Sequence, residues 1–234
     1  MNKSPIPIEA NHDWWWYVAK RKLLKFLIDK KIKEKKFNHI LEIGPGLGNN
    51  IQLLKSYGNV DVLETEQEFI KYLKKNLENQ IDKFYYDLIN IEKKFDLIVM
   101  LDVLEHIENS KEFMENLKKY VNSNGIIIIG VPAYMSLWSN HDKELKHYRR
   151  YTWNTLIRDC RDYKVIHRFG FNFLLLPIRF IQLKFSKRIH STNETGNLLN
   201  KIFLIISNIE YFLRYVGLNP KFGISIYAIM QKKE

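Results

Sequence analysis

Residues 40–50 read Ile-Leu-Glu-Ile-Gly-Pro-Gly-Leu-Gly-Asn-Asn, and they decide how the rest of this 234-residue chain is interpreted. The first four residues are mostly apolar and long enough for one buried strand of a parallel sheet. Glycines follow at alternate positions, Gly44, Gly46 and Gly48, before a segment that can begin a helix. A strand, a glycine turn and a helix start bring the backbone close to a ligand and direct free N–H groups at it. The stretch therefore predicts a nucleotide-type site.

The glycine spacing and one acid narrow the class of nucleotide. A dinucleotide fingerprint has the spacing G-x-G-x-x-G, whereas this chain has G-x-G-x-G. Glu42 stands two residues before Gly44, where a carboxylate would repel a pyrophosphate but suit a ligand with an ammonium or sulfonium group. Together these residues resemble motif I of the class I S-adenosylmethionine-dependent methyltransferases. The resemblance implies that Glu42, Gly44, Gly46 and Gly48 bind S-adenosylmethionine and its product S-adenosylhomocysteine; a plain strand-to-helix turn is the alternative.

Acids also follow the next two predicted strands. Residues 59–63 predict a second strand that ends at Glu64, and one carboxylate there can accept from both hydroxyls of a ribose. Residues 83–86 predict a third strand, closed by Asp87 and Leu88. In the resembled family an acid at this place accepts from the adenine amino group, and the next backbone N–H contacts the ring. The resemblance therefore implies cofactor contacts for Glu64, Asp87 and Leu88.

Residues 95–101 are the most apolar predicted strand, suited to a central position in the sheet, and Leu101 at its end is expected to contact the cofactor. The following residues, 102–107, read Asp-Val-Leu-Glu-His-Ile and resemble the segment after the fourth strand in the family. Asp-x-x-Glu-His could also suggest metal ligands, but it lacks a defined zinc spacing. We therefore expect no metal.

Strands that alternate with helices predict a doubly wound α/β sheet, which binds ligands beyond the carboxyl ends of its strands. A turn at 122–125 precedes a predicted fifth strand at 126–131, and residues 163–167 predict a sixth. The resemblance implies a seven-stranded Rossmann-like sheet whose last strand, at 223–230, is antiparallel to the others, with a helical insertion before it.

Length and composition fit a single domain, because 46% of the residues are apolar and can bury a full core. The one cysteine, Cys160, allows no intramolecular disulfide and fits a reducing compartment. No secretory signal is evident at the start of the chain, so a cytoplasmic location is expected. The expected single methyltransferase domain has four parts: an N-terminal helical cap (1–36), a cofactor-binding core (37–169), a helical apolar and basic insertion (170–222) and the last strand (223–234).

Three adjacent tryptophans, Trp14, Trp15 and Trp16, open the first predicted helix. They cannot all face one way, so at least one should contact a ligand, a lid or a membrane. Members of the resembled family carry an N-terminal aromatic patch and a following arginine over the cofactor, and Trp14, Trp15 and Arg21 match those positions. The alternative is an amphipathic helix that packs its aromatic side chains on the sheet.

Residues 133–142 and 147–151 follow the fifth predicted strand, where a methyl acceptor should bind. They resemble a subgroup of the family with Trp-Ser-x-His-Asp and then His-Tyr-Arg-Arg-Tyr. Methyl transfer needs in-line positioning, and an oxygen acceptor benefits from a base. His141 and His147 are the candidate bases, since histidine titrates near neutral pH; the alternative is that they only shape the loop. The substrate contacts expected in this segment are Trp138, Asp142, Tyr148, Arg149 and Arg150.

Residues 170–222 form an unusually long connection, with apolar runs at 171–183 and 198–218. Both runs are interrupted by proline or charged residues, and neither is a clean transmembrane span. The connection holds seven basic residues and two acids, a net charge of +5, within a chain of net charge +11. Apolar faces flanked by basic residues fit an element that lies on an anionic membrane surface. A helical cap on the substrate pocket or a homodimer interface is the alternative.

The expected function is transfer of a methyl group from S-adenosylmethionine to an oxygen atom of a small molecule, which could be glycan- or lipid-linked, at the inner face of a membrane. The net charge of +11 also suggests an RNA or other nucleic-acid methyltransferase. The chain lacks the Asn/Asp-Pro-Pro-aromatic tetrad of enzymes that flip and methylate base amino groups, so a nucleic-acid partner is not expected. A non-catalytic membrane-surface protein is a further alternative, against which the acids Glu42, Glu64 and Asp87 argue.

Overall fold

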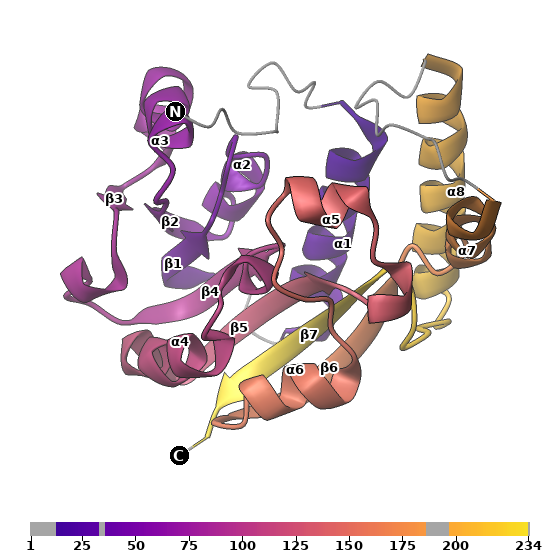
Figure 1. Ribbon diagram of the computed structural model, residues 1–234. Helices are drawn as coiled ribbons and strands as arrows, with labels where there is room; N and C mark the ends of the chain where they lie inside the picture. The colour runs from indigo at the N-terminus through magenta and orange to yellow at the C-terminus, as the bar shows by residue number, and fades with distance from the viewer. Residues whose placement is uncertain (1–12, 33–35, 186–196, 234) are drawn as a thin grey trace.

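The computed structural model describes residues 13–32, 36–185 and 197–233. Its seven strands form one sheet in the order β3-β2-β1-β4-β5-β7-β6, with helices on both faces (Figure 1). The strands are β1 (Phe37–Ile43), β2 (Gly58–Leu63), β3 (Lys83–Tyr85), β4 (Phe95–Leu101), β5 (Val121–Pro132), β6 (Tyr163–Phe171) and β7 (Ser225–Lys232). The α-helices are α1 (Trp15–Lys31), α2 (Ile51–Lys55), α3 (Gln67–Leu77), α4 (Ser110–Leu117), α5 (Asn140–Glu144), α6 (Trp153–Asp159), α7 (Leu176–Phe185) and α8 (Asn197–Tyr215).

Strand directions confirm the predicted sheet. β1 to β5 pair in parallel, whereas β7 lies between β5 and β6 and is antiparallel to both. The described part of the predicted insertion before the last strand contains α7 and α8, and residues 186–196 of it lie outside the described residues. The predicted turn at 122–125 is wrong, because these residues belong to β5. Val121 pairs with Phe95, and an irregularity in register before Ile126 accommodates the polar residues without ending the strand.

Successive residues of the central strands face two different hydrophobic layers, as strand geometry requires. Ile40 packs with residues of α1, α2 and α3 on one face. Leu41 and Ile43 pack with residues of α4 and α6 on the other. Because both faces of these strands are covered, their sequences are near-continuous apolar runs. The sheet is therefore doubly wound.

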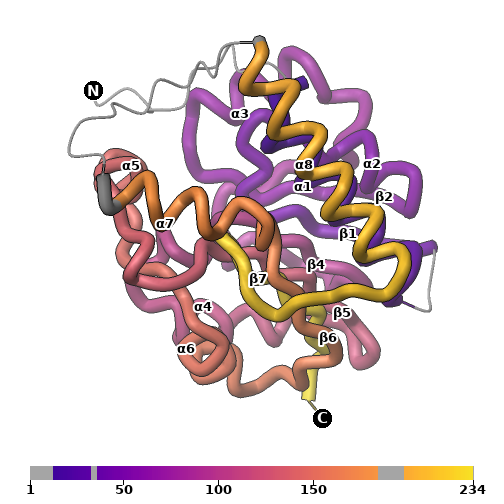
Figure 2. The backbone as a smooth tube through the Cα atoms, turned by 90° about the vertical axis from the view of Figure 1, so that its right-hand side faces the viewer, coloured from indigo at the N-terminus to yellow at the C-terminus, as the bar shows by residue number. Residues whose placement is uncertain are grey.

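The tryptophans of α1 hold the insertion in place. The Trp15 ring lies 4.9 Å from the Phe203 ring of α8, and the Trp16 ring lies 5.6 Å from that of Phe171. The backbone N–H of Trp15 also donates to Asn200 Oδ1 over 2.8 Å. Figure 2 shows α8 running along α1 on the flank of the molecule. Trp15 and Trp16 thus pack against the insertion and its preceding strand.

Candidate active site

The predicted cofactor residues converge at one edge of the sheet, because the carboxyl ends of β1 to β5 point the same way. Glu42 lies next to the end of β1, Glu64 follows β2, Asp87 follows β3 and Leu101 ends β4. The segment after β5 continues into α5, which lies above β4 and β5 at this edge in Figure 1.

The three glycines after β1 all have positive φ, at +64° for Gly44, +55° for Gly46 and +71° for Gly48. A Cβ at Gly44 would lie 2.7 Å from Val103 Cγ2, and one at Gly48 would overlap the side chains of α3. A Cβ at Gly46 would meet nothing within 4 Å. Gly44 and Gly48 are therefore required by packing, whereas Gly46 borders open space on the side where a ligand can approach the backbone.

Glu42 is a buried carboxylate with unused hydrogen-bonding capacity. Its Oε1 accepts from Asn50 Nδ2 over 2.8 Å, while Oε2 has no hydrogen-bond partner among the described residues. Burial raises the pKa of Glu42 to about 7, with smaller opposing effects of the Asn50 hydrogen bond and the Lys20 charge. A buried acceptor of this kind is expected to have a partner. A cationic ligand beside the glycine loop fits this requirement.

Glu64 closes the glycine loop from the neighbouring strand. Its Oε2 accepts from the Gly46 N–H over 3.1 Å, and Oε1 accepts from the backbone N–H groups of Thr65 and Glu66 at 2.8 and 3.0 Å. Burial raises the pKa of Glu64 despite these hydrogen bonds. A carboxylate offers about four acceptor positions, so one remains for a ribose hydroxyl. The ribose contact stays a prediction.

The other predicted cofactor residues occupy more open positions. Asp87 is exposed and its side chain accepts from the backbone N–H of Ile89, which caps a short 3-10 turn. Leu88 is half-buried, and Leu101 is buried at the end of β4. Arg21 is half-buried on α1. Their cofactor contacts stay predictions.

The structure adds three charged residues to the site that the sequence analysis did not predict there, namely Lys20, Asp102 and Glu105. Lys20 Nζ donates to Asp102 Oδ2 over 2.7 Å and so connects α1 to the end of β4. Asp102 has a φ of +57°, a conformation that is uncommon outside glycine and concentrated at functional sites. Glu105 is fully buried, and neither of its oxygens has a hydrogen-bond partner on another described residue. The Asp-x-x-Glu spacing was the only sequence signal for these two acids.

Asp142 accepts hydrogen bonds from several residues of the segment after β5. Its fully buried carboxylate accepts from Ser139 N at 2.9 Å, from His147 Nδ1 at 3.0 Å and from Arg150 Nε at 2.7 Å. Burial alone would raise the pKa of Asp142, but the hydrogen bonds from His147 and Arg150 hold it well below its usual range. Arg150 Nη1 also donates to the carbonyl of Ala133. The polar groups of Asp142 and Arg150 are thus satisfied within the protein, and their predicted substrate contacts stay untested.

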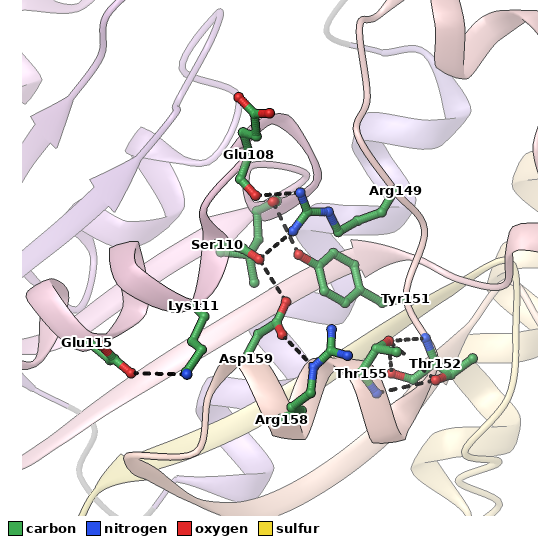
Figure 3. Close-up of polar contacts among 11 residues, drawn as sticks. Glu108, Ser110, Lys111, Glu115, Arg149, Tyr151, Thr152, Thr155, Arg158 and Asp159 are labelled. Atoms are coloured by element: carbon green, nitrogen blue, oxygen red, sulfur yellow. Dashed lines mark hydrogen bonds and ion pairs between the residues drawn. The ribbon is translucent and has the colours of Figure 1, made fainter.

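Arg149 binds a different part of the chain from Arg150. Its guanidinium donates to Ser110 Oγ over 2.7 Å and to the Glu108 carbonyl over 2.5 Å (Figure 3). Ser110 Oγ in turn donates to Asp159 Oδ2, so the network ties α4 to α6. Arg149 therefore has a structural role here, and its predicted substrate contact stays a prediction.

The remaining residues of this segment are closer to solvent. Tyr148 and His141 are exposed, and Trp138 is half-buried. Burial of part of the His141 ring lowers its pKa. His147 is less accessible, with 7% of its side chain exposed, and its ring meets the His106 ring edge-on at a centroid distance of 4.6 Å. His147 thus lies between Asp142 and the segment after β4.

A family described as "Methyltransferase domain" matches residues 15–173 of this chain. The chain belongs to this methyltransferase family. The matched span contains the glycine loop, the buried acids Glu42 and Glu64 and the segment after β5. The elements α7, α8 and β7 of this methyltransferase lie beyond it.

Two curated relatives cover parts of the methyltransferase. A "Ubiquinone biosynthesis O-methyltransferase" of Rickettsia typhi is 28% identical over 139 residues, covering 52% of this chain and 56% of the relative. A "Ribosomal RNA small subunit methyltransferase A" of Aliarcobacter butzleri is 32% identical over 91 residues, covering 38% of this chain and 33% of the relative. The chain therefore spans about a third to a half of the length of these curated relatives.

A solved structure shares the fold of this chain. The N-methyltransferase NodS from Bradyrhizobium japonicum, in complex with S-adenosylhomocysteine, superposes with a TM-score of 0.59 at 13% identity. The match covers 100% of this chain and 94% of that protein. This likeness confirms the predicted class I methyltransferase sheet.

Proposed function

We propose that this protein transfers a methyl group from S-adenosylmethionine to an oxygen atom of a small, glycan- or lipid-linked molecule, with S-adenosylhomocysteine as the other product. The proposal rests on Oε2 of buried Glu42, which has no hydrogen-bond partner among the described residues and lies two residues before the glycine loop with its open space at Gly46. The sulfonium of S-adenosylmethionine supplies an already activated methyl group. The protein then has to bind the cationic ligand and align the acceptor.

The acceptor side has a base in a suitable position. Because Asp142 accepts from Nδ1 of His147, the neutral ring keeps its lone pair on Nε2. A nitrogen of this kind can take the proton of an acceptor hydroxyl. His141 is the second candidate, on the exposed side of the same segment. An oxygen acceptor agrees with the name of the Rickettsia typhi relative, which is an O-methyltransferase.

A nucleic-acid acceptor is the second candidate function. The net charge of +11 and the likeness to a ribosomal RNA methyltransferase favour it. The residues after β4, Asp102-Val103-Leu104, lack the tetrad of base-amino methyltransferases. A small-molecule acceptor is therefore the better supported reading.

Calorimetry with S-adenosylhomocysteine tests the cofactor site. We expect wild-type protein to bind it and Gly46→Ala to bind at least about 10-fold more weakly, because the new methyl group lies in the open space beside the loop. Gly217→Ala is the matched control, since Gly217 also has positive φ and nothing within 4 Å of the added Cβ. Gly46→Ala carries a strain of about 1–2 kcal/mol, and Gly217→Ala, at a φ of +107° outside the left-handed helical region, carries at least as much. No binding by the wild type, or equal loss in both variants, contradicts the proposed site.

We also propose that α7 and α8 place the enzyme on the inner face of an anionic membrane. On α8, apolar side chains recur every three or four residues and are exposed, with Ile205 and Phe212 at 59% and 61% exposure. The buried side of the same helix carries Ser207, Glu210 and Arg214. The helix thus turns its apolar stripe outward, which is typical of an interaction surface. The exposed residues of this stripe are Leu198, Ile202, Ile205, Ile209 and Phe212.

The charges around this stripe favour a membrane over a second copy of the chain. No acidic side chain is exposed on the described residues of α7 and α8, and Lys201 is exposed among the apolar residues. Lys30 of α1 lies 5.0 Å from the ring of Tyr215 at the end of α8. Arg214 does not add to this charge, because it is buried and pairs with Glu210 at 2.6 Å. Among the described helices, none is long and apolar enough to cross a bilayer.

Vesicle co-sedimentation tests the membrane surface. We expect binding to vesicles that contain anionic lipid, release by salt, and strong loss of binding in Ile205→Glu/Ile209→Glu, which places two carboxylates in the apolar stripe. Ile166→Glu is the control, since Ile166 is an exposed apolar residue on the edge strand β6. Equal binding to neutral and anionic vesicles contradicts the proposal. So does a dimer in sizing columns that the double variant makes monomeric, because the stripe would then be the interface of a homodimer.

A further inference from the structure

Three potential metal ligands from two separate segments meet beside the acceptor region. Glu105 and His106 lie in a 3-10 turn after β4, and His147 follows α5. One ligand atom of each residue lies within 4.8 Å of those of the other two. The backbone N–H of Tyr148 donates to the Glu105 carbonyl over 2.8 Å and fixes one segment against the other. We propose that Glu105, His106 and His147 bind a divalent transition-metal cation.

Glu105 is the strongest argument for a cation. Its carboxylate is fully buried without a hydrogen bond from another described residue, and an ionised carboxylate in such a place requires a positive partner. The two nearby cationic side chains are already paired. Lys20 donates to Asp102 at 2.7 Å, and Arg150 donates to Asp142 at 2.7 Å. A metal ion between the carboxylate and the two imidazoles provides the missing positive charge.

His147 is oriented as metal-bound histidines usually are, and His106 lies next to it. His147 Nδ1 is hydrogen-bonded to Asp142 Oδ1 at 3.0 Å, so Nε2 is the nitrogen left for a ligand. The His106 ring meets the His147 ring at a centroid distance of 4.6 Å and an interplanar angle of 88°, so both imidazoles can reach one ion. Metal-bound histidines commonly donate their second ring N–H to a carboxylate or a backbone carbonyl, which fixes the tautomer and the ring orientation.

The donor set indicates the kind of ion. Two imidazoles and one carboxylate suit zinc, iron(II), manganese(II) or cobalt(II), and three protein ligands leave positions for water or substrate. Metal–ligand bonds of about 2.0–2.2 Å place neighbouring ligand atoms roughly 3–3.5 Å apart, which is compatible with three ligand atoms that all lie within 4.8 Å of one another. His106 is exposed and has room to turn. We expected no metal from the sequence because only Glu105 and His106 are adjacent there. The third ligand, His147, comes from a distant part of the sequence.

The ion also deepens the proposed function, on which this role rests. A cation at this place can bind an acceptor hydroxyl and lower its pKa, so that its proton passes to solvent water. With the ion bound, His147 Nε2 is a metal ligand, and His141 is the histidine that stays available as a base. Hydroxyl acceptors, especially those with a second oxygen that can also bind the metal, are therefore the substrate class that fits. Metal binding itself does not depend on the identity of the acceptor.

The test is metal binding by the full chain after treatment with a chelator. We expect calorimetry and elemental analysis to give one zinc, manganese or cobalt ion per chain, and cobalt(II) to show the absorption bands of a mixed nitrogen and oxygen site. Glu105→Gln and His106→Ala are expected to lower metal affinity by at least about 10–100-fold, with S-adenosylhomocysteine affinity retained. His141→Ala is the control for adventitious binding by a histidine of the same segment.

The inference is overturned if the chain binds no stoichiometric metal, or if the wild type and both variants bind it equally. Buried Glu105 would then be protonated rather than bound to a metal ion. His106→Ala keeps the test independent of folding, because His106 is exposed. A chain that binds metal through these residues but does not bind S-adenosylhomocysteine overturns the proposed function and leaves the metal site standing.

Discussion

Asp142→Ala is expected to lower the free energy of unfolding by about 3–5 kcal/mol, because it leaves the buried Arg150 guanidinium without its counter-ion. The carboxylate also loses hydrogen bonds from Ser139 and His147, so the whole segment after β5 loses its central acceptor. Small domains have total stabilities of roughly 5–15 kcal/mol. Urea unfolding of the wild type and the variant at low temperature measures the difference.

Two comparisons make this result specific to the buried pair. Asp142→Leu/Arg150→Met is expected to recover most of the loss, since an apolar pair of similar volume removes the unpaired charge. Glu115→Ala removes an exposed partner of Arg161, a 2.7 Å pair on the surface, and should cost below about 1 kcal/mol. A loss at Asp142 no larger than that at Glu115 means that solvent reaches the pair.

The same pair has a defined pH dependence. The pKa of Asp142 is depressed in the folded state by His147 and Arg150, against the effect of burial. Its contribution is therefore present above the unfolded pKa of about 3.9 and is lost as the pH falls toward the folded value. We expect the difference between wild type and Asp142→Ala to stay constant from pH 5 to 8.

Glu42→Gln is expected to stabilise the ligand-free protein and to weaken its cofactor binding. Burial raises the folded pKa of Glu42 to about 7. The unfolded carboxyl ionises first, so wild-type stability falls as the pH rises from about 4.5 to 7 and stays lower above it. Removing the ionisable group should therefore add on the order of 2–4 kcal/mol at pH 8 and little at pH 5.

Cofactor affinity should change in the opposite direction. A cationic ligand favours ionised Glu42, so wild-type affinity for S-adenosylmethionine should rise between pH 6 and 8. Glu42→Gln should lose about 10–100-fold in affinity and most of that pH dependence, with the remainder contributed by Glu64, whose pKa burial also raises. Calorimetry and thermal unfolding across this pH range measure both effects. Glu112→Gln, an exposed carboxylate on α4, is the control.

An affinity for S-adenosylmethionine that does not change with pH in the wild type contradicts this account of Glu42. So does a lower melting temperature of Glu42→Gln at pH 8, because it would mean that the ionised carboxylate is well solvated in the folded protein. Either result would remove the cation-binding role of Glu42 and leave the glycine loop as the main support for the cofactor site.

The strands of the sheet could be predicted from the sequence because each signal is local. Residues 95–101 are apolar apart from Asp96, as β4 requires when both faces of the sheet are covered. The left-handed backbone after β1 admits glycine far more readily than other residues, so Gly44, Gly46 and Gly48 mark the loop directly. The predicted turn at 122–125 was wrong because these residues form an irregularity within β5. Val121 before them pairs with Phe95 and Ile126 after them pairs with Leu97, so pairing with β4 on both sides outweighed their turn propensity.

Which side chains pair with one another depends on distances in the folded protein, and a local sequence pattern does not give these distances. His141 and His147 were equivalent candidates in the sequence, yet only His147 meets both Asp142 and His106. Asp142 and Arg150 read as substrate contacts and form a buried pair. The apolar stripe of α8 was visible in the sequence, but its outward orientation follows from α8 packing its polar side near α1. Periodicity shows that a helix has two faces, and the packing of the surrounding elements selects which one meets solvent.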